Sequence, residues 1–242
     1  MKLFDRKNFT MLFAGDSITD GNRGRSMDCN HIMGHGYAEM VAATLGLRYA
    51  VLTPRFVNRG VSGSTSLAMW SRWNAEVISL RPDLISILIG INDLSTGSPD
   101  TVISRYERVY RTLLEETRRA LPEVELMLLE PFSFDIPKQE KPYEEVPHPL
   151  CEPITMVPWS DTEQATPEKK SETTYVISAM QRLLPAIAAD FGALYVPLRE
   201  RLCAAAARST SKYIVWDGIH PTIVGHCVIA DAVLEALATQ GI

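Results

Sequence analysis

Ser17 is the first residue in the sequence that could act as a nucleophile. It lies in the stretch GDSITDG, residues 15–21, directly after a short apolar run. In a parallel α/β sheet, ligands bind beyond the carboxyl ends of the strands, so a serine just past the first strand can face a substrate. A serine in a Gly/Asp turn is more often a helix cap, and the stretch lacks the G-x-S-x-G pattern of α/β-hydrolases. Ser17 is therefore a candidate that needs a base.

A base and its orienting carboxylate occur together near the carboxyl end of the chain. The stretch WDGIHP, residues 216–221, holds Asp217 and His220 three residues apart. The two side chains can meet if the imidazole folds back over the turn, which would form the pair that nucleophilic catalysis requires. The alternative is that Asp217 caps a helix beginning near Thr222 while His220 only packs.

Two further turns offer hydrogen-bond donors for a developing negative charge. NRGVSG, residues 58–63, contains Gly60, and GIND, residues 90–93, contains Asn92. A backbone N–H at Gly60 and the side-chain amide of Asn92 could both donate to an oxyanion. Each has a plain alternative, since Gly60 can serve a tight turn and Asn92 or Asp93 can cap a helix.

These four turns need strands that bring them to one edge of a sheet. The expected strands are residues 10–14, 55–58, 84–89, 124–129 and 194–196, and three of them are near-continuous apolar runs typical of strands covered on both faces. Two intervening stretches have helical period. Their expected buried stripes are Val102, Ile103, Tyr106, Val109, Tyr110, Leu113, Leu114 and Thr117, and then Ile223, Val224, Cys227, Val228, Leu234 and Leu237. The alternation predicts an α/β sandwich with a parallel sheet.

Composition excludes several classes of protein. Hydrophobic residues make up 46% of the 242 residues and charged residues 22%, so the chain can bury a core and is not disordered as a whole. The net charge of −5 and the lack of Lys/Arg clusters argue against nucleic acid or a membrane surface as partner. Four widely spaced cysteines fit reduced thiols. With no secretion-signal pattern and no long apolar run, we expect a cytoplasmic protein whose partner is a small molecule.

Residues 135–170 interrupt the α/β pattern. They hold seven of the fifteen prolines and eight acidic residues, with no glycine. Proline removes a backbone donor and disfavours helix in the residue before it. We expect one domain over residues 1–242 with a proline-rich insertion here. The insertion is expected to shape substrate access or subunit contact, so a homo-oligomer is possible.

Together, GDSITDG, NRGVSG, GIND and DGIHP resemble, in this order, the four blocks of the SGNH (GDSL) esterase family. The resemblance covers nearly the whole chain apart from residues 135–170. The stretches RPDLISILIGIND and WDGIHPTIVGH look like the bacterial carbohydrate O-acetylesterases of this family, the acetylxylan esterase type, more than like its secreted lipases. It implies a flavodoxin-like three-layer α/β/α sandwich with a five-stranded parallel sheet. The implied roles are Ser17 as nucleophile, His220 as base, Asp217 as its orienting group, and Ser17 N–H, Gly60 N–H and the Asn92 amide as oxyanion donors. No metal or cofactor is implied.

The sequence then predicts a serine esterase that removes small acyl groups, acetyl above all, from carbohydrates. Trp216 and Tyr37 are the candidate substrate-binding residues. A short-chain lysophospholipase or thioesterase could use the same residues, and a non-catalytic sugar-binding module is the alternative from another class.

The remaining aromatic, cysteine and histidine residues favour structural roles. Trp70 and Trp73 stand at helical spacing, which favours packing. Cys29, His31 and His35 favour a wall of the site over a metal cluster. His226 is expected on the terminal helix without a catalytic part.

Overall fold

A single parallel sheet forms the centre of the protein. The computed structural model describes residues 6–26, 30–134 and 167–239. The strands are β1 (Thr10–Gly15), β2 (Arg55–Asn58), β3 (Leu84–Leu88), β4 (Glu125–Leu129) and β5 (Leu194–Val196), paired in the order β2-β1-β3-β4-β5. Every neighbouring pair is parallel. The predicted five-stranded parallel sheet is confirmed, and each strand lies within one residue of its expected bounds.

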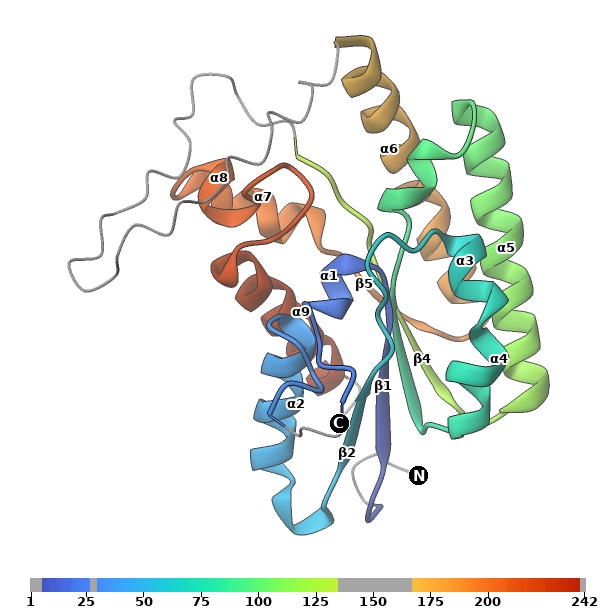
Figure 1. The fold of residues 1–242 in the computed structure, drawn as a ribbon, viewed down its shortest axis with the longest axis vertical. Coiled ribbons are helices and arrows are strands. Elements are labelled where there is room, and N and C mark those ends of the chain that lie inside the picture. The colour runs from blue at the N-terminus through green and yellow to red at the C-terminus, as the bar shows by residue number, and fades with distance from the viewer. Residues whose placement is uncertain (1–5, 27–29, 135–166, 240–242) are drawn as a thin grey trace.

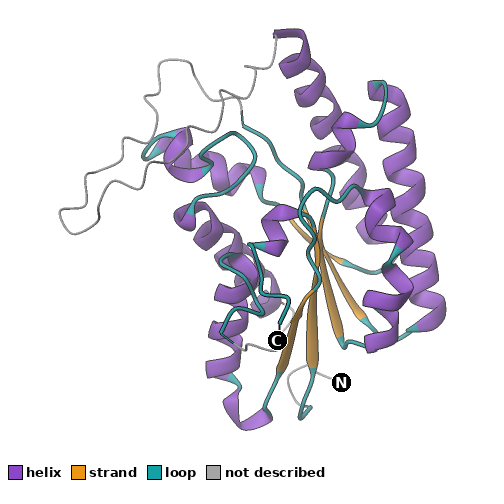
Figure 2. Cartoon of the chain, in the orientation of Figure 1, coloured by secondary structure: helices purple, strands orange, loops and turns teal. Residues whose placement is uncertain are grey.

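Helices cover both faces of this sheet (Figure 1). The α-helices are α1 (Ser17–Asp20), α2 (Tyr37–Arg48), α3 (Ser66–Ser71), α4 (Trp73–Glu76), α5 (Pro99–Ala120), α6 (Pro167–Asp190), α7 (Arg199–Ala207), α8 (Ser211–Ile214) and α9 (Ile223–Thr239). Short 3-10 helices are η2 (Ala50–Leu52), η3 (Ile78–Leu80) and η4 (Ile91–Ser95). Figure 2 shows the orange strands enclosed between two groups of purple helices, the three-layer sandwich that the sequence predicts.

Alternating side chains of the strands feed two separate cores. Met11 and Phe13 of β1 pack in the core with α2 and α9, while Leu12 and Ala14 pack in the core with α5 and α6. Both sets are buried, which explains why β1 reads as a continuous apolar run. Each fully buried large apolar side chain contributes roughly 1.5–3 kcal/mol of transfer free energy. The two cores fix the sheet and with it the turns at its carboxyl edge.

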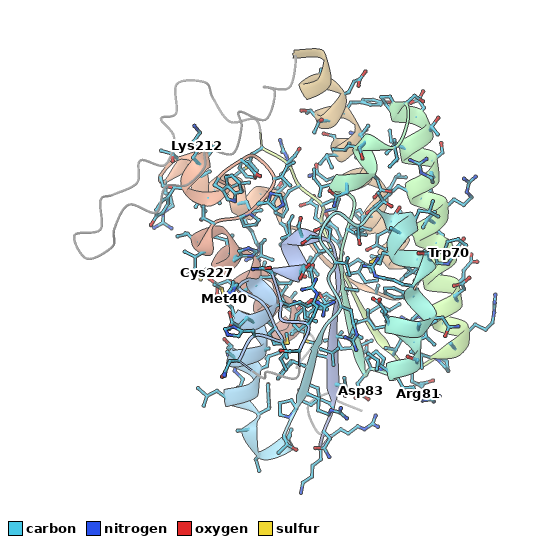
Figure 3. All side chains as sticks on the ribbon, viewed as in Figure 1. Met40, Trp70, Arg81, Asp83, Lys212 and Cys227 are labelled. Atoms are coloured by element: carbon cyan, nitrogen blue, oxygen red, sulfur yellow. The ribbon has the colours of Figure 1, made fainter. Side chains whose placement is uncertain are left out.

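Helix α5 confirms its predicted stripe. Pro99 occupies the first turn, where its missing N–H costs nothing, and Arg118 and Arg119 complement the helix dipole in the last turn. Its buried residues are Val102, Tyr106, Val109, Tyr110, Leu113, Leu114 and Thr117, and Ile103 packs partly buried against the same core. The predicted packing role of the two tryptophans is also confirmed. Trp73 donates to the Thr117 hydroxyl (2.8 Å), and Trp70, labelled in Figure 3, donates to Glu116 (3.0 Å).

Helix α9 has the predicted extent but a different buried face. Ile223 is 75% exposed and Cys227 is exposed, whereas the buried residues are Gly225, His226, Ile229, Ala230, Ala232, Val233 and Leu237. Of the predicted stripe only Leu237 is buried, and Val224, Val228 and Leu234 pack at its margin. The helix is apolar around most of its circumference, so periodicity did not identify the face. Close approach did, because a Cβ on Gly225 would lie 2.2 Å from the Ile214 carbonyl oxygen.

The last four residues of the predicted insertion are helical. Helix α6 already begins at Pro167, so residues 167–170 are helical, since proline is well suited to the first turn of a helix. Residues 135–166, and with them the predicted access or subunit-contact role, lie outside the described residues.

Candidate active site

Ser17 begins helix α1 immediately beyond β1. Asp16, not Ser17, is the N-cap, because its carboxylate accepts the Ile18 N–H at 3.0 Å. Gly15 is required by close packing, since a Cβ there would lie 2.3 Å from both the Leu88 carbonyl oxygen and the Thr19 hydroxyl oxygen. The helix-cap alternative for Ser17 is thereby removed, and its side chain is free to point elsewhere.

The Ser17 hydroxyl meets His220. Ser17 Oγ lies 2.9 Å from His220 Nε2, and His220 Nδ1 lies 2.7 Å from Asp217 Oδ2. The two ring nitrogens thus join a hydroxyl on one side to a carboxylate on the other. This is the nucleophile–base–orienter arrangement that activates a serine.

The turn 216–220 holds Asp217 and His220 in register. Asp217 Oδ1 accepts the backbone N–H groups of Ile219 (2.9 Å) and His220 (2.7 Å), so the carboxylate is oriented before it meets the ring. Trp216 N donates to the His220 carbonyl (3.1 Å), which closes the turn. Asp217 does not cap α9; instead the Thr222 hydroxyl accepts the Gly225 N–H at 3.3 Å.

Asp217 and His220 each shift the pKa of the other towards its charged form. The hydrogen bond from Asp217 is the main reason that the pKa of His220 is raised above 6.5, although burial opposes it. Burial acts to raise the pKa of Asp217, but hydrogen bonds from the His220 ring and from the backbone N–H groups of His220 and Ile219 hold it below its usual value. Asp217 therefore remains a carboxylate that stabilises a protonated His220.

Asp16 adds a second carboxyl group beneath the nucleophile. It is 1% exposed, and burial raises its pKa to about 7 against the lowering effect of the Ile18 N–H bond and of His220. A group with this pKa changes charge near neutral pH. The sequence signal for Asp16 was only its place beside Ser17.

Two of the three predicted oxyanion donors, Gly60 and Asn92, follow neighbouring parts of the sheet but differ in their hydrogen bonding. Asn92 Nδ2 donates one hydrogen to the Ser64 carbonyl at 3.0 Å, and an amide nitrogen carries a second. The Gly60 N–H, in contrast, is already donated to Asn58 Oδ1 at 2.8 Å. Gly60 lies against α1, since a Cβ there would be 2.3 Å from Asp20 N. An oxyanion would share the Gly60 hydrogen with Asn58.

The two candidate substrate-binding residues have opposite environments. Trp216 is 47% exposed and stacks on the His220 ring, with centroids 6.0 Å apart and planes 24° apart. Tyr37 is fully buried, packs edge-on against Phe13 and bonds its hydroxyl to Thr19 Oγ1 at 3.0 Å. The expectation of Tyr37 as a substrate contact is therefore wrong, because its ring belongs to the core beneath β1.

Within the described residues, the other histidines and cysteines form no metal-binding cluster. His226 is on α9 as predicted, where its Nδ1 accepts the Tyr37 N–H at 3.2 Å and burial lowers its pKa to about 4. His31 and His35 have ring centroids 6.3 Å apart, and Cys29 lies outside the described residues. Within residues 6–26, 30–134 and 167–239 no group of three or more His, Cys, Asp or Glu side chains could hold a metal. In the same part of the chain, no helix is long and apolar enough to cross a bilayer.

Sequence reasoning missed two buried aspartates that hold the loop between β2 and α3. Asp20 accepts the Ser62 N–H (3.0 Å) and hydroxyl (2.9 Å), and Asp93 accepts the Ser66 N–H (2.8 Å) and hydroxyl (2.6 Å). Both aspartates are 1% exposed. Their only signal in the sequence was an acidic residue inside each of two candidate motifs.

Comparison with known proteins agrees with this geometry. The sequence matches the GDSL-like Lipase/Acylhydrolase family over residues 13–228. An acetylxylan esterase from Geobacillus stearothermophilus is 26% identical over an alignment of 239 positions, which covers 95% of this chain and 94% of that protein. The crystal structure of Axe2, an acetylxylan esterase from Geobacillus stearothermophilus, is 26% identical and has a TM-score of 0.70, covering 98% of this chain and 96% of that one.

Further solved structures are similar. One from Parabacteroides merdae, described as a GDSL-like lipase, has a TM-score of 0.77 and 27% identity, and covers 96% of this chain and 97% of that one. Two forms of the Geobacillus esterase are described as catalytic mutants, with a serine or an aspartate replaced by alanine. The chain is a carboxylic ester hydrolase and belongs to the GDSL-like Lipase/Acylhydrolase family.

Proposed function

We propose that the chain is a serine esterase that removes small acyl groups, acetyl above all, from carbohydrates through an acyl-enzyme intermediate. The observation that carries the proposal is the unbroken path from Ser17 Oγ through both His220 nitrogens to Asp217, with distances of 2.9 and 2.7 Å. A serine hydroxyl is a weak nucleophile until a base within hydrogen-bond reach accepts its proton.

The first step acylates Ser17. His220 Nε2 takes the hydroxyl proton as Oγ attacks the ester carbonyl carbon, and Asp217 stabilises the imidazolium that results. The negative charge on the carbonyl oxygen is met by the Ser17 N–H, the second Asn92 N–H and the Gly60 N–H. His220 then gives its proton to the leaving sugar oxygen as the C–O bond breaks.

The second step releases the acid. A water loses a proton to His220 Nε2 and attacks the acyl carbon, and the collapse of this second tetrahedral intermediate returns the proton to Ser17 Oγ. The same three side chains thus serve both halves of the reaction, and the enzyme ends in its starting protonation state.

The preference for a carbohydrate rests on Trp216 and on the named relative. Trp216 is half exposed beside His220, where an indole face can stack on a sugar ring while the acyl group reaches Ser17. The Geobacillus protein of similar length is an acetylxylan esterase by name. The named relative therefore supports the acetyl group as the part that is removed, and the exposed indole of this chain supports a sugar as the part that is bound.

A panel of esters tests the proposal. We expect kcat/KM to be highest for acetylated xylo-oligosaccharides, lower for 4-nitrophenyl acetate and much lower for 4-nitrophenyl octanoate. Trp216→Ala should lower kcat/KM on the sugars more than on 4-nitrophenyl acetate. Trp70→Ala is the matched control, because it removes an indole that packs against the core with α5 and donates to Glu116. A preference for octanoate would favour the lysophospholipase or thioesterase alternative, and no turnover of any ester would favour the binding module.

A further inference from the structure

Two consecutive side chains of η4 hold the segment Ser64–Ser66 from one side. Asn92 Nδ2 donates to the Ser64 carbonyl at 3.0 Å. Asp93 accepts the Ser66 N–H with Oδ2 at 2.8 Å and the Ser66 hydroxyl with Oδ1 at 2.6 Å. Ser64, Ser66 and Asp93 are 4%, 1% and 1% exposed, so the two Asp93–Ser66 bonds are shielded from water, and the Asn92–Ser64 bond is partly buried.

The Asp93–Ser66 contact constrains the direction of the Asn92 amide. An amide group is planar, so once one N–H is donated to Ser64 the direction of the other is fixed. The position of the Ser64 carbonyl in turn depends on Ser66, two residues further along the same segment. Asp93 is the neighbour of Asn92 in η4, so the two side chains and the segment form a closed set of contacts.

Folding stability alone does not explain a buried carboxylate at Asp93. Among the described residues it has no ion pair within 4.0 Å, and burial raises its pKa even though the Ser66 bonds lower it. Burying a charged side chain costs solvation free energy, which its hydrogen bonds only partly return. Two apolar side chains of similar size in the same place would not carry this cost. Such a group is expected where geometry, not folding free energy, is what the site needs.

We propose that Ser66 and Asp93 are positioning residues that set the orientation of the Asn92 amide through the Ser64 carbonyl. This inference rests on the proposed function, in which Asn92 stabilises the oxyanion. Neither Ser66 nor Asp93 touches the substrate; each acts only through the segment Ser64–Ser66 and Asn92.

The same loop offers a matched control at its other end. Ser62 makes the same two kinds of bond, from its N–H and its hydroxyl, to the buried carboxylate of Asp20. Unlike Asp93, Asp20 is paired with an arginine, Arg25, at 2.8 Å. Ser62 itself lies outside the segment Ser64–Ser66 that Asn92 contacts. Ser62 is exposed whereas Ser66 is buried, but replacing Ser62 removes a hydroxyl with the same kind of partner without releasing Ser64.

The test is a double-mutant cycle on 4-nitrophenyl acetate with kcat and KM measured separately. Asn92→Ala should lower kcat by about 10² to 10³. Ser66→Ala should lower kcat about 10-fold with KM almost unchanged, since small misplacements already cost up to about 10²-fold. In the Asn92→Ala background, Ser66→Ala should change kcat by less than about 2-fold, whereas Ser62→Ala should keep its own effect there.

A conservative variant separates positioning from packing. Asp93→Asn keeps an oxygen for the Ser66 N–H and supplies an amide hydrogen to the Ser66 oxygen, so it should retain most of kcat where Asp93→Ala does not. Circular dichroism and thermal melting report the folded fraction of each variant, and if Ser66→Ala does not fold, the two Asp93 variants carry the test.

Two results would overturn the proposal differently. If the kcat reductions of Ser66→Ala and Asn92→Ala multiply in the double variant, the Asp93–Ser66 contact does not set the orientation of the Asn92 amide. The same conclusion follows if Ser62→Ala couples to Asn92→Ala as strongly as Ser66→Ala does. If Asn92→Ala itself leaves kcat unchanged, the oxyanion assignment fails first and the positioning role fails with it.

Discussion

Gly60→Ala tests whether the loop after β2 must lie tightly against the nucleophile. A Cβ at Gly60 would be 2.3 Å from Asp20 N and 2.7 Å from the Thr19 carbonyl carbon. Both atoms are backbone, so no side-chain rotation relieves the overlap. Restoring an ordinary contact of roughly 3.4 Å moves the loop by about 1 Å away from α1, and a misplacement of about 1 Å costs on the order of 10²-fold in rate.

The measurement is kcat and KM on 4-nitrophenyl acetate beside a thermal melt. Gly63→Ala is the control in the same loop, because Gly63 has a φ of 78° but nothing within 4 Å of an added Cβ. We expect Gly63→Ala to lose about 1 kcal/mol of stability through backbone strain and to keep its kcat. Gly60→Ala with wild-type kcat would refute the close-packed loop as part of the site.

Three further predictions concern the ionisable and nucleophilic groups. Ser17→Ala and His220→Ala should each abolish nearly all hydrolysis in a folded protein, and the double variant should be no slower than either, as assayed on 4-nitrophenyl acetate. Wild-type kcat/KM should rise with pH through the pKa of His220, which lies above 6.5. In Asp217→Asn the rising part of the pH–rate profile should move to lower pH, and kcat should fall by about 10³ to 10⁴. Asp16 binds its proton more tightly in the folded state, at a pKa of about 7 against 3.8, so its contribution to stability is complete below pH 3.8 and is lost as pH rises towards 7. That loss is on the order of 4 kcal/mol, and Asp16→Asn should flatten the pH dependence of urea unfolding between pH 4 and 8.

Much of the fold is local and could be predicted from the sequence. The sheet is covered on both faces, so strands such as residues 84–89 read as apolar runs, and β3 differs only in ending at Leu88. The stripe of α5 was clear because its outer face is polar. The face of α9 was not, because Ile223 is exposed while small residues such as Gly225 and Ala230 make the contact.

The site divides in the same way. Ser17, Asp217 and His220 stand in short motifs whose chemistry is legible, and the fold brings them within hydrogen-bond reach. The environment of Tyr37 depends on Thr19 and Phe13, and the engagement of the Gly60 N–H depends on Asn58.

The Asp93–Ser66 contact joins residues 27 positions apart, and nothing in the local sequence marks it. Contacts of this kind are set by packing between elements, which composition and periodicity do not encode.

Covalent trapping shows which serine is the nucleophile, and we expect it to be Ser17 at the end of β1. The protein is treated with a serine-directed organophosphonate, its intact mass is measured, and the modified peptide is sequenced by mass spectrometry. We expect one adduct per chain, on Ser17. We expect no adduct in Ser17→Ala, which lacks the hydroxyl, or in His220→Ala, which lacks the base that activates it. An adduct on Ser62 or Ser64, or an active enzyme that takes no adduct at all, would contradict it.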